Sequence, residues 1–293
     1  MSPARALLRT VRPHQWVKNI FVAAPLVFAR HLTETGYLAR TAIAVLAFCL
    51  LSGAVYTFND VRDVERDREH PVKKHRPIAA GHLSEHTAMI AAAVLAAGSL
   101  AAMFALSPLA CAYAAAYLAQ NVAYSLKLKQ IAFVDVALIA SGFLLRVLGG
   151  AAAIDVPPSE WLLLCTALLA LFFGLGKRAH ELEWARRSGS AAITRAALAG
   201  YRIEVVRVAM FVIGAATVIA YALYTVDART VHFFGTDRLV YSTPFVALGI
   251  VRFLFLALWK PKDESPTEAM LRDPYFLAIL AGATATVLYI IYG

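Results

Sequence analysis

The segment from Asn59 to Asp67 (NDVRDVERD) holds the residues whose types and spacing could do chemistry. If a helix continues through it, Asp60, Asp63 and Asp67 project within an arc of about 60°, at about 100° per residue. Three carboxylates on one helix face repel each other unless divalent cations lie among them. Hard oxygen ligands of this kind suit Mg²⁺, which prefers one or two carboxylates together with waters and phosphate oxygens. The spacing therefore predicts a magnesium site formed by Asn59, Asp60, Asp63 and Asp67.

A plainer interpretation of the same segment is a solvated helix end. Arg62, Arg66 and Arg68 are spaced so that they could form ion pairs with the neighbouring acids along the helix. Both interpretations place the segment on a helix that ends at a polar surface, so the surrounding elements have to decide between them.

Those elements are apolar. The chain has 293 residues, of which 60% are hydrophobic and 16% charged, with a mean hydropathy of +0.64, which excludes a water-soluble globule. The net charge of +9 raises the question of a nucleic-acid partner, but the basic residues lie between long uncharged runs, such as those from Glu85 to Lys127 and after Asp273. We therefore expect a polytopic membrane protein surrounded by membrane lipids, with no nucleic-acid partner.

The apolar runs predict an all-α fold in one integral-membrane catalytic domain spanning residues 1–293. Only helices or closed barrels satisfy their backbone groups in lipid, and the alternating pattern of a barrel is absent. The three cysteines lie inside apolar runs and are expected to be small buried hydrophobes. Nine membrane-spanning helices are expected, at about 17–33, 37–58, 86–106, 108–126, 132–153, 159–176, 204–224, 239–259 and 274–292.

The distribution of basic residues predicts the orientation of these helices. Most of the 28 Lys and Arg fall in the N-terminal segment and in the loops at 59–85, 127–131, 177–203 and 260–273. The opposite loops contain only four, which are Arg30, Arg40, Arg229 and Arg238. The positive-inside rule therefore places the N-terminus and the long polar loops in the cytoplasm, where they would form a cap, and the C-terminus outside the cell's inner (plasma) membrane.

The acidic segment at the end of the second of nine helices resembles the first acidic motif of the UbiA-type membrane prenyltransferase superfamily. The resemblance covers essentially the whole chain. It implies an intramembrane helical bundle in which acidic motifs hold Mg²⁺ on a diphosphate while a C–O or C–C bond forms.

The sequence departs from the common pattern of this superfamily after the sixth helix. Most members have a second Asp-x-x-x-Asp there, whereas this chain reads GKRAHELEW from Gly176 to Trp184, without an aspartate. A Lys-Arg pair followed by Glu suits additional phosphate contacts and fewer metal ions. Two other segments are RPHQWVKN from Arg12 and YSLKLK from Tyr124. Together with the missing aspartate motif, they make the chain similar to one branch of the superfamily. That branch transfers 5-phosphoribosyl from phosphoribosyl pyrophosphate (PRPP) to polyprenyl (decaprenyl) phosphate, for the precursors of cell-wall arabinan.

Under this resemblance, cations near the polar face would bind the 5-phosphate and the lipid phosphate. Each could equally mark topology or contact lipid headgroups. The candidates are Lys18, Lys73, Arg76, Tyr124, Lys127, Lys129, Lys177 and Arg178. Glu181 and Asp135 either complete the metal site, orient these cations, or serve as structural ion-pair partners. Arg146 lies about 15–20 Å along its helix, at 1.5 Å per residue, and is expected to face the active site or a buried acid.

Two other functions compete with this one. The first is an orthodox prenyltransferase that joins a prenyl diphosphate to an aromatic acceptor such as a quinone precursor, with Glu181 and Glu183 replacing the second aspartate motif. The second is a transporter or scaffold, which is disfavoured because charged residues concentrate on one face and no internal repeat is evident. The sequence is also compatible with a homo-oligomer.

Overall fold

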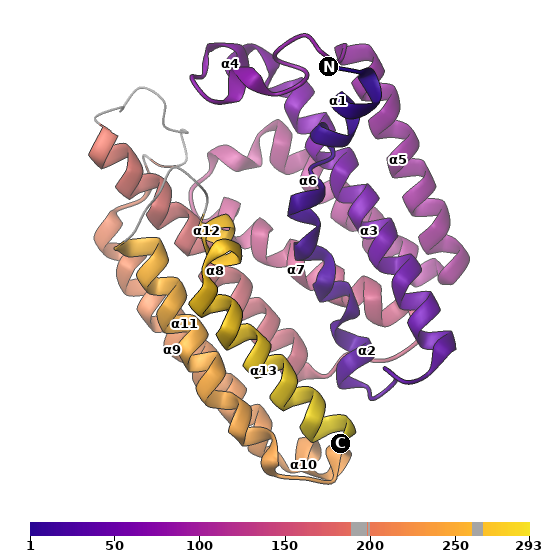
Figure 1. Cartoon of the computed structure of the whole chain (residues 1–293), viewed down its shortest axis with the longest axis vertical. Coiled ribbons are helices and arrows are strands. Elements are labelled where there is room, and N and C mark those ends of the chain that lie inside the picture. Colours follow the sequence, from indigo (N-terminus) through magenta and orange to yellow (C-terminus); the bar gives the residue numbers. More distant parts are fainter. Residues whose placement is uncertain (189–197, 199, 260–265) are drawn as a thin grey trace. The chain divides into compact units, whose positions relative to one another are not determined.

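The computed structural model of the chain describes residues 1–188, 198, 200–259 and 266–293, and no β-strand occurs among them. The all-α prediction is confirmed. The helices pack as two compact units. Unit 1 comprises Met1–Lys129 and Ser141–Pro158, and unit 2 comprises Gln130–Ala140 and Ser159–Gly293 (Figure 1).

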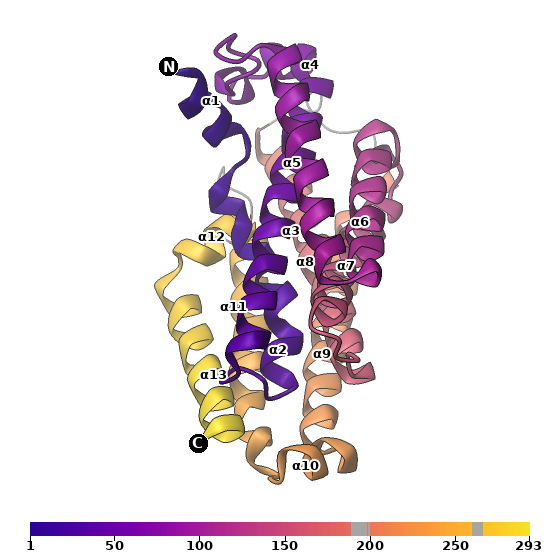
Figure 2. The same ribbon diagram turned by 90° about the vertical axis from the view of Figure 1, so that its right-hand side faces the viewer.

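Helix α3 (Thr35–Arg62) is the central element of unit 1. It lies beside α5 (Glu85–Leu106), as Figures 1 and 2 show. It also contacts α6 (Pro108–Leu126) and the 3₁₀ helix η1 (Pro13–Ala23). The core between them contains Phe48, Leu51, Met103 and Tyr117. The unit also contains α1 (Pro3–Thr10), α2 (Ala24–Phe28), α4 (Val64–Glu69), η2 (Lys73–His75), most of η3 (Leu128–Gln130) and most of α7 (Val134–Ala153).

A second, smaller apolar cluster lies at the polar end of unit 1. Ala6 of α1, Val64 of α4 and Ala88 of α5 pack with Ile78 and Leu83 from the loop between α4 and α5. All five side chains are buried. This cluster fixes the loop that follows the acidic segment against the helices, and so it positions the basic residues of that loop.

Unit 2 is a bundle around an aromatic core. Phe172, Met210 and Phe253 are almost fully buried, and the two phenylalanine rings lie 5.1 Å apart. Around them pack the first turns of α7, α8 (Glu160–Ser188), α9 (Ile203–Val226), α11 (Thr243–Leu258), α12 (Pro266–Arg272) and α13 (Pro274–Tyr292). The short elements α10 (Ala228–Phe234) and η6 (Arg238–Ser242) follow α9 in the same unit.

Seven helices are long and apolar enough to cross a membrane among the residues that the structure describes. Two of the nine expected spans are not among them. The expected span at 17–33 is not one α-helix, because it consists of η1 and the short α2, which has Pro25 in its first turn, where a missing N–H is tolerated. The span at 108–126 is helical as α6, but it is not one of the seven.

Two expected boundaries are also wrong. Helix α3 continues to Arg62 instead of ending at residue 58, and α8 continues from the expected end at 176 to Ser188. Much of the loop expected at 177–203 is therefore helical. Its residues 189–197 and 199 lie outside the described part of the chain.

Gly150 allows the backbone of α7 to approach η1 within unit 1. A Cβ at this position would lie 1.9 Å from the carbonyl oxygen of Val22. We expect Gly150→Ala to lower the free energy of unfolding by about 2 kcal/mol, the usual scale of overpacking. Gly98 in α5 has open space around its Cβ position, so Gly98→Ala should be neutral or stabilising. Equilibrium unfolding in detergent micelles measures both, and equal losses would contradict the steric argument.

Candidate active site

The acidic segment does not form one continuous helix. Helix α3 ends at Arg62, Asp63 has the non-helical dihedrals φ −99° and ψ 7°, and α4 begins at Val64. The prediction of one carboxylate face on an unbroken helix is therefore wrong. The break turns Asp63 away from Asp60 and Asp67, which share a basic partner.

Asp60 and Asp67 are each only 3% exposed and meet at Arg76. Its Nη1 donates to Asp60 Oδ1 at 3.0 Å and to Asp67 Oδ2 at 2.6 Å. These two oxygens therefore lie no more than 5.6 Å apart, which is the sum of the two distances. Arg12, whose backbone is left-handed with φ 53°, donates from Nη2 to the same Asp60 oxygen at 2.5 Å. Two carboxylates and two guanidinium groups thus form one compact charged cluster.

Asp63 has a different partner. Lys129 Nζ lies 2.8 Å from both carboxylate oxygens of Asp63 and 3.3 Å from Asn59 Oδ1. Lys129 is 7% exposed, so this ammonium group is held in place at the start of the segment that leads to α7. The three aspartates of the segment therefore pair with Arg12, Arg76 and Lys129. They do not form the expected helix-end pairs with Arg62, Arg66 and Arg68. Arg68 instead pairs with Glu65 and Glu85.

The donor set of this segment fits a magnesium ion. Within the described ranges, no group of three His, Cys, Asp or Glu side chains is arranged to hold a metal. Mg²⁺ needs only one or two carboxylates, however, and takes its remaining ligands from water and phosphate oxygens. One carboxylate oxygen of Asp60 and one of Asp67 lie next to the same position, which the guanidinium of Arg76 occupies. The residues are thus suited to share a cation with a diphosphate.

A second charged cluster is buried in unit 2. Asp135 near the start of α7 and Arg178 in α8 are both fully buried, and Arg178 Nε lies 3.0 Å from Asp135 Oδ2. Arg178 also pairs with Glu181 one turn later in the same helix. The sequence predicted all three as site residues, and the structure brings them together.

Tyr201 completes this cluster, and sequence reasoning missed it. Its hydroxyl donates to Asp135 Oδ1 at 2.5 Å and accepts the backbone N–H of Phe133 at 2.7 Å. Phe133 is held in the left-handed region with φ 66°. Burial and the hydrogen bond to Asp135 raise the pKa of Tyr201, so the phenol stays protonated and remains a donor at neutral pH.

Arg146 lies in a polar network inside unit 1. Its guanidinium donates to Asn19 Oδ1 at 2.7 Å, to the Tyr117 hydroxyl at 2.8 Å and to the Gly142 carbonyl at 2.9 Å. The Tyr117 ring lies beneath it, with its centroid 4.6 Å from the guanidinium carbon. These contacts are all with neutral groups, and the ion pairs found among the described residues do not include Arg146. Asn19 ends the RPHQWVKN segment that carries part of the resemblance, whereas Tyr117 had no sequence signal beyond its place in an apolar run.

The other predicted phosphate-binding residues are spread over four segments of the chain. Lys18 donates to Gln15 at 2.6 Å, and Lys73 lies in η2 of the loop that carries Arg76. Tyr124 lies in the last turn of α6 and Lys127 directly follows that helix, with its side chain exposed. Lys177 precedes Arg178 in α8.

Comparisons with known proteins agree with the geometry. The profile described as the UbiA prenyltransferase family matches residues 20–280. A protein of Mycobacterium tuberculosis (strain H37Rv) named decaprenyl-phosphate phosphoribosyltransferase is 35% identical over 291 residues, covering 96% of this chain and 92% of that protein. A protein of the same name from Mycolicibacterium smegmatis is 40% identical over 222 residues, covering 74% and 69%.

Solved structures support the fold. A UbiA homologue from Archaeoglobus fulgidus, solved with GPP and Mg²⁺, superposes with a TM-score of 0.73 over 98% of this chain and 100% of that chain. The same homologue bound to DMAPP and Mg²⁺ gives a TM-score of 0.72. Sequence identity is 19% in both cases, so this likeness concerns the fold alone.

Proposed function

This chain belongs to the UbiA prenyltransferase family, and from that premise we propose that it transfers 5-phosphoribosyl from PRPP to a polyprenyl phosphate such as decaprenyl phosphate. The observation that carries the proposal is the charge of the second cluster. Where an orthodox prenyltransferase would have a second aspartate motif, α8 has Lys177 and the buried Arg178. Lysine and arginine side chains at this position favour the binding of phosphate groups in addition to the diphosphate. The names of the mycobacterial relatives support the same acceptor.

The proposed reaction is a single displacement at the anomeric carbon. An oxygen of the lipid phosphate forms a bond to C1 of the ribose, the C1–O bond to pyrophosphate breaks, and the pyrophosphate leaves with the electron pair. Because the lipid phosphate is already anionic at neutral pH, the reaction requires no dedicated general base. Attack opposite the leaving group predicts inversion at C1.

Asn59, Asp60, Asp63 and Asp67 are the proposed Mg²⁺ ligands. When bound, the ion would neutralise charge that develops on the leaving pyrophosphate. Arg76 binds both Asp60 and Asp67, and Arg12 binds Asp60, so the two arginines hold these carboxylates in place and supply positive charge where the diphosphate would lie.

The remaining charged residues would bind the other phosphates. Arg178 is proposed as a substrate-binding residue, with Asp135 and Glu181 orienting its guanidinium. Arg146, in the polar network of unit 1, is proposed as a substrate-binding residue for the lipid phosphate. Binding of a substrate phosphate also stays a prediction for six further residues, which are Lys18, Lys73, Tyr124, Lys127, Lys129 and Lys177.

The membrane arrangement belongs to the same proposal. We infer nine spans in the inner (plasma) membrane, with η1–α2 and α6 added to the seven long apolar helices. The N-terminus and the reaction would be cytoplasmic, the C-terminus outside, and the whole chain one catalytic domain. The product would serve as a precursor of cell-wall arabinan.

Membranes that contain the protein test the proposal directly. Incubated with Mg²⁺, PRPP labelled in the ribose and polyprenyl phosphate, they should form a labelled lipid, and excess EDTA should abolish its formation. A prenyl diphosphate with an aromatic acid serves as the competing substrate pair. A labelled lipid formed only from that pair would replace our proposal with the orthodox prenyltransferase. Glu181 and Glu183, which that alternative needs, are paired with Arg178 and Arg207.

A further inference from the structure

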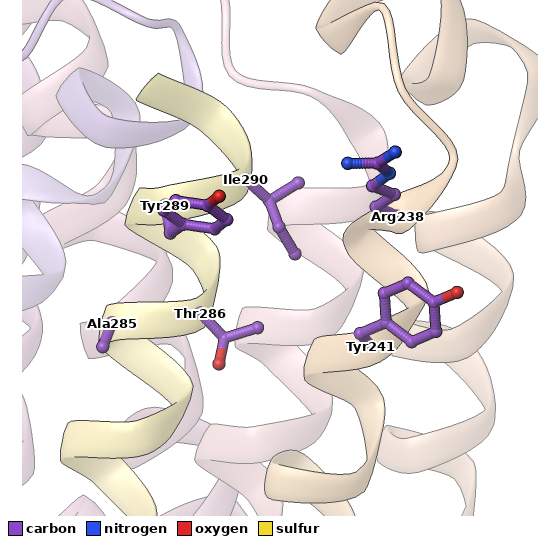
Figure 3. Close-up of a pocket in the computed structure, with 6 residues that line it drawn as sticks. All are labelled: Arg238, Tyr241, Ala285, Thr286, Tyr289 and Ile290. Carbon is purple, nitrogen blue, oxygen red and sulfur yellow. The ribbon is translucent and has the colours of Figure 1, made fainter. Parts of the chain in front are cut away.

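A groove lies at one end of unit 2, between η6 and the last turns of α13. It has a volume of about 620 Å³ and is lined by Arg238, Tyr241, Ala285, Thr286, Tyr289 and Ile290 (Figure 3). Its size is within the usual range for small-molecule sites. Helix α9, which begins next to Tyr201 and ends at Val226 near this groove, has 24 residues and so is about 36 Å long at 1.5 Å per residue. The groove is therefore separate from the cluster of Asp135 and Arg178.

The polar groups of the groove are all able to donate hydrogen bonds. Arg238 contributes a guanidinium, Tyr241 and Tyr289 contribute phenols, and Thr286 contributes a hydroxyl, whereas none of the lining residues is acidic. The backbone N–H of Arg238 donates to Thr236 Oγ1 at 3.2 Å, but its guanidinium forms no ion pair or hydrogen bond within the described part of the chain. Tyr241 is 67% exposed and Tyr289 is 76% exposed. Such a set matches an acceptor-rich anion, and a phosphate group fits it best.

The α13 wall of the groove carries apolar residues as well as donors, and this helix faces outward. Ala285 and Ile290 lie beside the donors, and only 6% of the most apolar window of α13 is buried inside the protein. Arg238 begins one candidate span, Arg238–Leu258, and Tyr289 lies near the end of another, Pro274–Tyr292. Both residues therefore belong at the same membrane–water boundary, where arginine and tyrosine contact headgroups.

We propose that this groove binds a glycerophospholipid of the surrounding membrane. The phosphodiester would lie against Arg238 and the two phenols, and one acyl chain would lie along the outward face of α13 beside Ile290. The charge of the groove favours this occupant over a second copy of the chain, because its donors, with no acidic residue among the lining, complement an anion. The separation from the Asp135–Arg178 cluster of the same unit favours a structural lipid over the polyprenyl phosphate substrate.

Photo-crosslinking of the full-length protein tests this site. The probe is phosphatidylglycerol with a diazirine on one acyl chain, added to delipidated protein in detergent, and labelled peptides are mapped by mass spectrometry. We expect labelling of residues 285–290, and Arg238→Gln should reduce it about tenfold. Arg229→Gln is the matched control, since this exposed arginine lies in α10 outside the groove, and it should leave labelling unchanged.

A second probe removes the phosphate instead of the arginine. A diacylglycerol with the same diazirine chain should label residues 285–290 about tenfold less than the phosphatidylglycerol probe, in the unmodified protein. Equal labelling by the two probes, or full labelling of the Arg238→Gln variant, would overturn the proposal. Preferential displacement of the probe by polyprenyl phosphate would assign the groove to that lipid instead, and crosslinks between two protein chains at these residues would assign it to a second copy.

Discussion

Replacing Asp60 by Asn is expected to lower kcat/KM for phosphoribosyl transfer by about 1,000-fold, which corresponds to about 4 kcal/mol of transition-state stabilisation. Asp60 is 3% exposed and is the acceptor shared by Arg12 and Arg76. Asparagine keeps the shape of the side chain but removes its negative charge. The change therefore leaves two guanidinium groups without their shared anion and removes a proposed Mg²⁺ ligand at the same time.

Initial rates with PRPP and polyprenyl phosphate, measured over a range of Mg²⁺ concentrations, check this result. Glu65→Gln is the matched control, because Glu65 belongs to the same acidic segment but its side chain is 80% exposed and pairs with Arg68. We expect this control to keep its activity. Full activity of the Asp60→Asn variant at all Mg²⁺ concentrations would remove the metal assignment.

The sequence was informative about which residues form this cluster, but less so about their geometry. The spacing of Asp60, Asp63 and Asp67 indicated oxygen ligands at a helix end, and all three lie there. Neither the break of the helix at Asp63 nor the partner of Asp63 was predictable, and that partner, Lys129, is distant in sequence. Arg12 also could not be identified as the partner of Asp60, since its approach requires a left-handed backbone before η1.

The fold of the apolar segments was largely predictable, because bilayer thickness and backbone hydrogen bonding leave few alternatives. The end of α8 was missed for a physical reason. Hydropathy falls at Lys177, yet the following residues include Glu, Leu, Ala and Arg, which are good helix formers, so the helix continues to Ser188. Tyr201 was missed because a single tyrosine after a polar segment has no periodic signal, and only tertiary structure brings it to Asp135.

Replacing Asp135 by Asn should both destabilise unit 2 and reduce activity. Asp135 and Arg178 are fully buried, so the substitution leaves a guanidinium charge in the core with only Glu181 as its partner. Breaking a buried ion pair typically costs about 3–5 kcal/mol, mostly because of the charge that is left behind. We expect a loss of about 3 kcal/mol in the free energy of unfolding, measured by equilibrium unfolding in micelles, together with a large fall in transfer rate.

The double variant Asp135→Asn/Arg178→Met separates the structural from the functional contribution of this pair. Since a neutral, apolar replacement removes both buried charges, stability should largely return. Activity should not return, because the proposed phosphate-binding guanidinium is gone. Asp273→Asn provides the control, because the Arg252–Asp273 pair lies in the same unit and should affect stability without changing the transfer rate. If the double variant regained activity together with stability, Arg178 would be a purely structural residue, and the substrate phosphates would have to be bound by other cations.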